Sequence, residues 1–148
     1  MIEIYTDGSA QPNPGKGGYG IILISGNYRK ELSQGFIKTT NNRMELLAVI
    51  VALETLKIEN SDVILTTDSK YVVDAINKEW LYNWEKNNFK NRVNSDLWKR
   101  LLPLLRKHNI TFKWIKGHNN HIENENCDRL AVLAAQSDNL IEDIGYIK

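Results

Sequence analysis

The first 25 residues, MIEIYTDGSAQPNPGKGGYGIILIS, predict two β-strands joined by a turn. Apolar or β-branched side chains alternate with others over residues 2–6, and residues 18–25 are again rich in strand formers. Glycine and proline crowd the stretch between the two runs. Asp7 follows the first run directly, and functional side chains of α/β proteins collect where strands end. The segment therefore predicts the start of a sheet and a candidate acidic site beside it.

The rest of the chain continues this sheet and covers it with helices. MELLAVIVALETL at 44–56 is too long and too rich in Leu and Ala for a strand, so a buried helix is expected there. A returning strand, a β-α-β crossover and a final helix complete the pattern, giving the order β-β-β-α-β-α-α-β-α. The remaining expected elements are strands at 28–37, 62–67 and 110–115 and helices at about 69–77 and within 78–107, with a last helix that closes the stretch ENENCDRLAVLAAQ at 123–136. This order predicts an α/β fold with a mixed sheet, an antiparallel meander plus parallel strands, flanked by α-helices.

Length and composition are typical of one globular domain. The 148 residues are 42% hydrophobic and 25% charged, and no apolar run approaches the roughly 20 residues of a membrane span. Cys127 is the only cysteine, so an internal disulfide is excluded, and the N-terminus lacks the pattern of a secretory signal. We expect a single domain over 1–148, no membrane association and a cytoplasmic location.

Positive charge is concentrated in one segment. The formal net charge is +1, yet residues 78–107 hold eight Lys or Arg against three acids, a net of +5, and the remainder carries −4. A solvated helical face explains such a segment as well as a nucleic-acid contact does. The uneven charge is therefore compatible with a surface at 78–107 that binds a polyanion and with an acidic site elsewhere in the chain.

Four acids are candidates for that site: Asp7, Glu45, Asp68 and Asp128. Asp68 follows the strand at 62–67, Glu45 is the only charge from Met44 to Leu53, and Asp128 begins the last expected helix. Each also has a structural explanation, because turns, helix caps, capping boxes and helix dipoles all favour acids at such places. Their joint placement favours a site, and a cluster of ionised carboxylates needs a divalent cation to be tolerated. An all-oxygen set suits Mg²⁺ or Mn²⁺.

The motifs that hold these acids resemble bacterial type I ribonuclease H. YTDGS with NPGKGGYG, TTNNRMELLAVIVAL, TTDSKYVVDAI, the NW before DLW, and WIKGHNNHIENENCDRLA match its motifs in order over about residues 1–137. The resemblance implies a ribonuclease H fold with a five-stranded sheet. It also implies hydrolysis of the RNA strand of an RNA–DNA hybrid, leaving 5′-phosphate and 3′-hydroxyl ends.

The resemblance assigns roles to the acids. Asp7, Glu45, Asp68 and Asp128 would be ligands of two Mg²⁺ ions, with Mn²⁺ as a substitute, and Asp7 would bridge the two ions. Asp128 would serve the ion that activates water, and Glu45 with Asp68 the ion at the leaving group. Two such ions about 4 Å apart support an in-line displacement at phosphorus.

GHNNH at 117–121 offers two histidines. By resemblance His118 is the catalytic histidine that moves protons or assists product release, whereas His121 matches a structural position. A zinc site of His118, His121 and Cys127 is disfavoured, because it lacks a fourth ligand and paired cysteines. GKGGYG at 15–20 satisfies the dinucleotide pattern G-x-G-x-x-G but runs into a strand, so a turn between antiparallel strands is the preferred interpretation.

Substrate contacts also come from the resemblance. The matching positions Asn13, Asn41 and Asn42 contact the duplex in its minor groove, and Thr40 belongs to a pocket for a DNA-strand phosphate. Residues 78–107 resemble the family's basic handle, a helix pair that binds the DNA strand. Its contacts include Trp80 and Lys86, although core packing is the favoured role of Trp80, Trp84 and Trp98. The loop KNRVNSDL is shorter and less basic than in the familiar form, which predicts weaker binding and a shallower salt dependence.

Two other functions stay open at this stage. One is a hybrid-binding module without catalysis, and the other is a DNA nuclease of the same superfold, such as an integrase or resolvase. The complete acid set argues against the first, and NNRME with the handle argues against the second. A monomer is expected from the resemblance, no protein partner is inferred, and the tail at 138–148 is left open between a strand-like piece and a frayed end.

Overall fold

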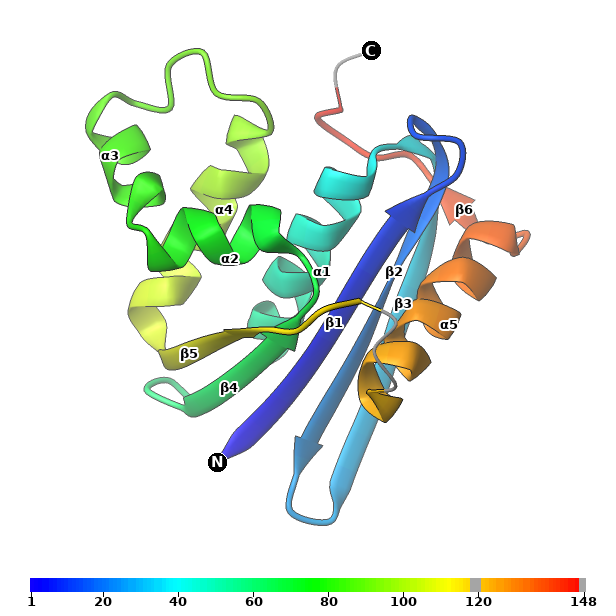
Figure 1. Ribbon diagram of the computed structural model, residues 1–148, viewed down its shortest axis with the longest axis horizontal. Helices are drawn as coiled ribbons and strands as arrows, with labels where there is room; N and C mark the ends of the chain where they lie inside the picture. Colours follow the sequence, from blue (N-terminus) through cyan, green and yellow to red (C-terminus); the bar gives the residue numbers. More distant parts are fainter. Residues whose placement is uncertain (118–120, 147–148) are drawn as a thin grey trace.

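The computed structural model describes residues 1–117 and 121–146, which form a mixed sheet flanked by helices (Figure 1). The strand order is β5-β4-β1-β2-β3-β6. β1–β2 and β2–β3 pair antiparallel, and the other three pairs are parallel. The expected meander and crossovers are confirmed. The elements are β1 (Ile2–Ala10), β2 (Gly15–Ser25), β3 (Tyr28–Thr39), α1 (Asn41–Glu54), β4 (Asp62–Thr67), α2 (Lys70–Asn77), α3 (Trp80–Lys86), α4 (Ser95–Lys107), β5 (Asn109–Trp114), α5 (Ile122–Gln136) and β6 (Leu140–Ile141).

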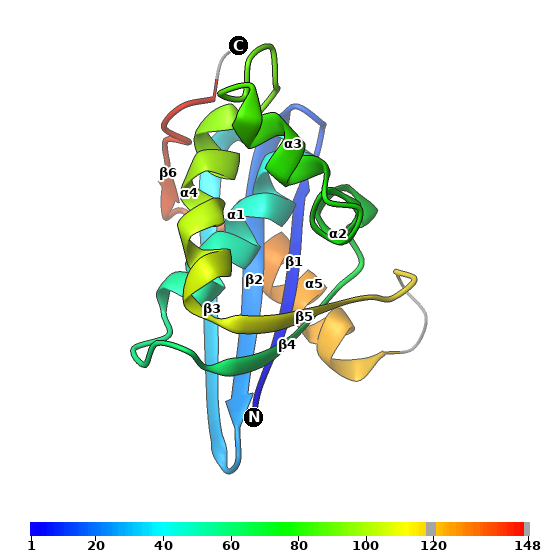
Figure 2. The same ribbon diagram turned by 90° about the vertical axis from the view of Figure 1, so that its left-hand side faces the viewer.

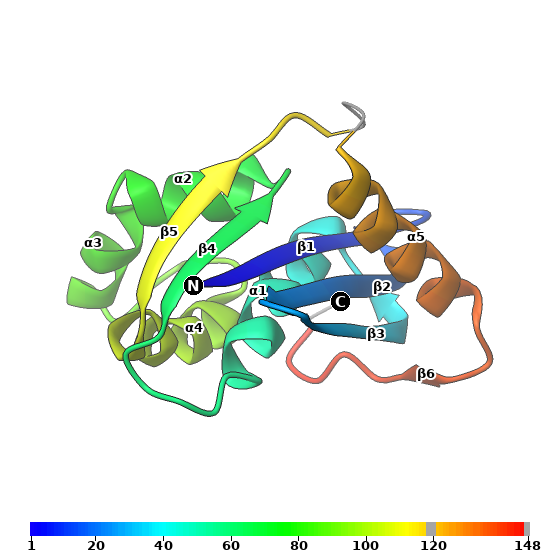
Figure 3. The same cartoon turned by 90° about the horizontal axis from the view of Figure 1, so that it is seen from below.

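The helices divide unequally between the two faces of the sheet. α1 to α4 lie on one side and α5 alone on the other (Figures 2 and 3). α1 is buried over most of its circumference, because it packs on β1 and β2 beneath and on α4 above. This double burial explains why its sequence is apolar on nearly every face. In the described part of the chain no helix has the length and apolar character needed to cross a membrane.

Strand β1 is longer than expected and Asp7 is not at its end. Its antiparallel pairing with β2 runs on to Ala10↔Gly17, whereas its parallel pairing with β4 stops at Thr6↔Thr67. The predicted break at Asp7 was therefore wrong for β1. It marks instead the point where the neighbouring strand β4 ends, which opens the sheet on one side of Asp7.

The glycine-rich segment 15–20 lies inside β2, so its interpretation as a turn was wrong; the turn is at 11–14. The rejection of a dinucleotide site is confirmed, since no helix follows the motif. The glycines serve close packing of α5. A side-chain carbon built on Gly20 would collide with the carbonyl oxygen of Cys127, and one on Gly18 would lie 2.5 Å from that of Ala131.

A Gly20→Ala substitution is therefore expected to destabilise the protein by about 1–3 kcal/mol, because the new methyl group meets helix backbone that cannot rotate away. Denaturant unfolding measures the change. Gly26→Asn is the control, since Gly26 faces open space and asparagine tolerates its positive φ. Equal stabilities of the two variants would contradict close packing of α5 on β2.

Helix boundaries differ from the expected ones at two functional places. α1 begins at Asn41 instead of 44, because the Thr40 hydroxyl accepts a hydrogen bond from the Arg43 N–H and caps the helix. α5 begins at Ile122, where His121 is the cap, so Asp128 is the seventh residue of that helix and not its first. The polar run before Asp128 hides a helical turn that has few apolar residues.

The basic segment 78–107 forms two helices. The expected element order had one helix here, whereas the helix pair that the resemblance implied is confirmed. α3 and α4 are separated by 87–94, in which Asn88, Phe89, Asn91 and Asn94 have positive φ. Asparagine adopts this left-handed conformation more readily than most residues, which ends one helix before the next begins. The tail adds β6, a sixth short strand beside β3 that was not among the five expected.

Candidate active site

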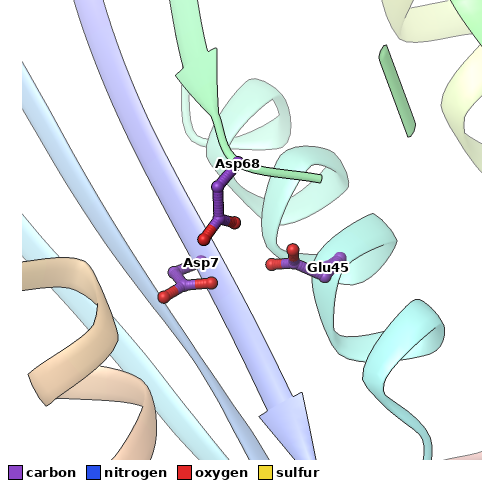
Figure 4. Close-up of side chains that lie close together, drawn as sticks. All are labelled: Asp7, Glu45 and Asp68. Atoms are coloured by element: carbon purple, nitrogen blue, oxygen red, sulfur yellow. The ribbon is translucent and has the colours of Figure 1, made fainter. Parts of the chain in front are cut away.

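Three of the four predicted acids lie together where β4 ends. Asp7, Glu45 and Asp68 each offer a carboxylate oxygen, and these atoms all lie within 4.8 Å of one another. Figure 4 shows the three side chains converging from β1, α1 and the residue after β4. Segments that are 38 and 23 residues apart in the sequence thus meet at one point.

Local structure positions each acid. Asp68 follows β4 directly, and the helix cap that was its structural alternative belongs to Ser69, whose hydroxyl accepts from the Val72 N–H. Glu45 lies beyond the first turn of a helix capped by Thr40, so the proposed capping box is also wrong. Asp7 accepts a hydrogen bond from the Gly8 N–H at 2.8 Å. Neither Asp68 nor Glu45 is needed as a helix cap.

Crowding and burial oppose ionisation of the cluster. Asp7 is only 6% exposed. Burial, and after it repulsion from Asp68, raises the pKa of Asp7 from 3.8 to about 8. Burial also raises the pKa of Glu45 well above its usual value, with repulsion from Asp7 and Asp68 as the next cause. Three carboxylates are therefore held where they cannot all ionise without added positive charge.

The oxygen atoms of the cluster fit a divalent cation. Among the described residues, Glu45 Oε1 and Asp68 Oδ1 are buried and have no hydrogen-bond partner. A buried carboxylate oxygen without a donor is costly, whereas oxygen ligands are what Mg²⁺ and Mn²⁺ prefer. The donor set and its unsatisfied atoms thus suit the metal that the sequence predicts.

Asp128 lies at the edge of the same groove, outside the three-residue cluster. The groove has a volume of about 670 Å³ and is lined by Asp7, Glu45, Asp68 and, from α5, Asp128 and Val132. Asp128 is half-buried, and its charge adds to the raised pKa of Asp7. The fourth acid thus lines the same groove and is close enough to raise the pKa of Asp7.

The asparagines predicted to contact substrate line this groove. Asn13, Asn41 and Asn42 all border it. Asn41 fixes the turn at 11–14, because its side chain accepts from the Ala10 N–H at 2.6 Å while its own N–H donates to Asn13 Oδ1 at 3.1 Å. Their binding role stays a prediction, but the structure places them beside the acids.

A second cavity of about 640 Å³ adjoins the groove, since Asn13 and Asn42 line both. Thr40, the residue predicted to contact a phosphate, lines this cavity together with Asn94 and Ser95. The first turns of α1 and α4 meet here, and Asn94 makes no side-chain cap to α4. Converging helix N-termini favour an anion.

The predicted histidines have different outcomes. His118 lies outside the described residues. His121 has the structural role expected of it, because its Nδ1 accepts from the Asn124 N–H at the start of α5. Cys127 is fully buried and burial raises the pKa of its thiol, which argues against the zinc alternative.

The tryptophans of 78–107 differ in burial. Trp98 is 1% exposed and packs against Trp84 with ring centroids 5.4 Å apart, so both are core anchors. Trp80 is 43% exposed and does not share that role. Lys86 ends α3 with an exposed side chain. The favoured core-packing role was therefore wrong for Trp80. The side chains of Trp80 and Lys86 are exposed, and their contact with substrate stays a prediction.

Sequence reasoning overlooked Arg43, which lies between Asn42 and Met44 at the start of α1. Its guanidinium is 2% exposed and pairs with Asp143 in the tail and Asp96 on α4. A charge next to a run of apolar residues is a usable signal for a buried ion pair, but its partners are 53 and 100 residues away.

Comparisons with known proteins agree with this geometry. The family model for RNase H matches residues 1–136. A "Ribonuclease H" of Trichodesmium erythraeum is 54% identical over 150 residues, covering 98% of this chain and 95% of the relative.

Two solved structures resemble the fold. LC9-RNase H1, described as a type 1 RNase H, has a TM-score of 0.81 at 30% identity over 91% of this chain and 72% of its own. LC11-RNase H1, solved in complex with an RNA/DNA hybrid, has a TM-score of 0.71 at 24% identity over 92% and 97% of the two chains. With its family model, its relatives and its acid cluster in agreement, this chain belongs to the RNase H family, as an enzyme of the ribonuclease H type.

Proposed function

We propose that this protein is an endonuclease that hydrolyses the RNA strand of RNA–DNA hybrids, with two Mg²⁺ ions as cofactors and Mn²⁺ as a substitute. The observation that carries the proposal is the cluster of Asp7, Glu45 and Asp68, with buried oxygens that lack donors, in a chain of the RNase H family. The hybrid as substrate is supported by LC11-RNase H1, a relative in fold that is bound to one.

The four acids would hold the ions, Asp7, Glu45 and Asp68 from the cluster and Asp128 from α5 in the lining of the same groove. When bound, the ions supply an activated water and stabilise the leaving oxygen. The reaction forms a bond from water oxygen to phosphorus and breaks the bond from phosphorus to O3′. The water loses a proton to solvent or to a base, and the departing O3′ gains one. This gives the 5′-phosphate and 3′-hydroxyl ends. We assign His118 to these proton movements.

The lining of the groove suits a hybrid more than a DNA duplex. Asn13, Asn41 and Asn42 present amide groups that can donate to and accept from a ribose 2′-hydroxyl, the group that distinguishes RNA from DNA. The adjoining cavity with Thr40 lies at two helix N-termini, where a phosphate of the second strand is favoured. We infer that the two adjoining cavities each take one strand of the duplex.

The basic segment 78–107 would hold the DNA strand through Trp80 and Lys86. Part of its charge is already paired, since Lys78 pairs with Asp74, Arg100 with Glu54 and Arg106 with Glu85. Fewer free cations release fewer counterions on binding, so the dependence of affinity on salt is expected to be shallow.

The testing experiment is cleavage of a hybrid labelled on its RNA strand, with Mg²⁺, with Mn²⁺ and with EDTA, beside DNA and RNA duplexes of the same sequence. We expect cutting of the hybrid's RNA alone, with both metals and not with EDTA. The product ends are identified by 5′ labelling with a kinase. An end that carries a 5′-phosphate takes up label only after treatment with phosphatase.

Other outcomes decide between the alternatives. Hybrid binding without cutting under every metal tried would favour the binding module and overturn the enzyme. Cutting of the DNA duplex in preference to the hybrid would favour an integrase-like or resolvase-like nuclease. Either result would contradict the proposal.

A further inference from the structure

Arg43, which lines the second cavity together with Asp96, joins three segments of the chain. From the first turn of α1, its Nε donates to Asp143 Oδ2 at 2.7 Å in the C-terminal tail. Its Nη2 donates to Asp96 Oδ2 at 2.8 Å and its Nη1 to Asn94 Oδ1 at 3.2 Å, both at the start of α4. One guanidinium thus connects α1, α4 and the tail.

Asp143 is the buried end of this network. Its side chain is 3% exposed, compared with 40% for Asp96. It also accepts from the Thr39 hydroxyl at 2.6 Å, so the end of β3 fixes its position. Burial lowers the pKa of the Arg43 guanidinium, but hydrogen bonds to Asp96 and Asp143 more than reverse this shift and keep it charged. Asp143 is therefore the group that orients the Arg43 fork.

The network ends on residues that line both cavities. Asn94, which accepts from Arg43, donates through Nδ2 to the Tyr71 hydroxyl at 3.1 Å, and Tyr71 lines the groove of the acids. Asn94 itself lines the second cavity with Thr40, and the tail adds Gly145 and Tyr146 to its wall. A shift of Arg43 would therefore move the start of α4 relative to Thr40.

We propose that Asp143 is a positioning residue for substrate binding: through Arg43 it holds Asn94 and the N-terminus of α4 at the spacing from Thr40 that a DNA-strand phosphate of the hybrid requires. This inference rests on the proposed function. It gives the C-terminal tail a role in binding the strand that is not cut, at a distance from the acids that cut the other.

The test uses full-length protein and hybrids in which one DNA-strand phosphate at a time is replaced by a neutral methylphosphonate. For the wild type, the neutral linkage at the position that occupies the cavity is expected to raise KM about 5–10-fold with kcat nearly unchanged. Asp143→Asn is expected to raise KM for the unmodified hybrid by a similar factor, with no further rise from that linkage. A merely structural role would not remove the response to one phosphate.

Glu54→Gln is the matched control. Glu54 pairs with Arg100 and also joins α1 to α4, but on an exposed surface away from the cavity lining. This variant should retain the wild-type KM and the full response to the neutral linkage. All measurements are made at a temperature where each variant is folded by circular dichroism.

Each outcome bears on the proposal. If Asp143→Asn responds to the neutral linkage as the wild type does, Asp143 does not position the cavity. If the wild type cleaves hybrids but responds to no neutral linkage, the cavity is not a phosphate site and the inference fails while the proposed function stands. No cleavage by the wild type would overturn both. If Asp143→Asn does not fold, Thr39→Val removes one hydrogen bond to Asp143 and is expected to show a smaller loss of the same response.

Discussion

An Asp7→Asn variant is expected to lose cleavage of the hybrid by about 10³-fold or more, which corresponds to several kcal/mol of lost transition-state stabilisation. Asp7 interacts with the other three acids, and an amide supplies at most one neutral oxygen in place of a carboxylate. Hybrid binding measured in EDTA should be retained or tighter, because one negative charge facing the phosphates is gone. Single-turnover cleavage and fluorescence anisotropy separate these two effects.

The same substitution should stabilise the protein when metal is absent. The folded-state pKa of Asp7 is raised from 3.8 to about 8, so folding favours the protonated acid. The corresponding stability is fully present below about pH 4 and is lost as the pH rises towards 8, where the unfolded chain is ionised without penalty. In EDTA at pH 8, the free energy of unfolding of Asp7→Asn should therefore be higher than that of the wild type by on the order of 2–3 kcal/mol.

Thermal unfolding between pH 4 and 8, with EDTA and with Mg²⁺, measures this difference. Saturating Mg²⁺ should reduce the difference in stability between variant and wild type, because bound metal stabilises the folded wild type and stabilises the variant much less. Glu59→Gln, at an exposed carboxylate, is the control and should show no pH-dependent gain. A wild type that is most stable at pH 8 in EDTA would contradict the crowding of the three acids.

The cluster could be predicted from sequence because its signals are local. Asp7 interrupts a strand pattern, Asp68 ends another, and Glu45 is a lone charge in an apolar helix. Asp7 and Asp68 each follow the last parallel pair of β1 and β4, Thr6↔Thr67, so predicting these two strands as parallel neighbours implies that the two acids are close, although β1 itself continues past Asp7. Asp128 was placed in the correct helix but not at the correct turn, because 122–126 has a polar composition that masks the helix start.

Other features could not be predicted, because they depend on packing between distant segments. The six residues GKGGYG have turn composition, yet they form a strand because α5 requires glycine beneath it. Asn88 and Asn94 divide the basic segment through backbone conformation that their residue type permits but does not require. The Arg43 network joins residues up to 100 positions apart, and no local pattern indicates which acids it will meet.

Replacing Arg43 by methionine is expected to lower the free energy of unfolding by about 3–5 kcal/mol, because Asp143 is left buried without its counter-charge. In a domain of this size the loss corresponds to a fall in Tm of roughly 10 °C. Arg100→Met is the matched control. Arg100 also joins α1 to α4, but its pair with Glu54 is exposed, so a change of about 1 kcal/mol or less is expected.

A second substitution distinguishes charge burial from lost packing. Arg43→Met combined with Asp143→Leu leaves no buried charge at the junction, so part of the lost stability should return, as is seen when buried ion pairs are replaced by apolar groups. Recovery will be incomplete by about 1 kcal/mol, since the Thr39 hydroxyl loses its acceptor. If the double variant is less stable than Arg43→Met alone, packing and not charge would dominate at this junction. If it regains stability but keeps a raised KM for the hybrid, the network is needed for the shape of the phosphate cavity as well as for folding.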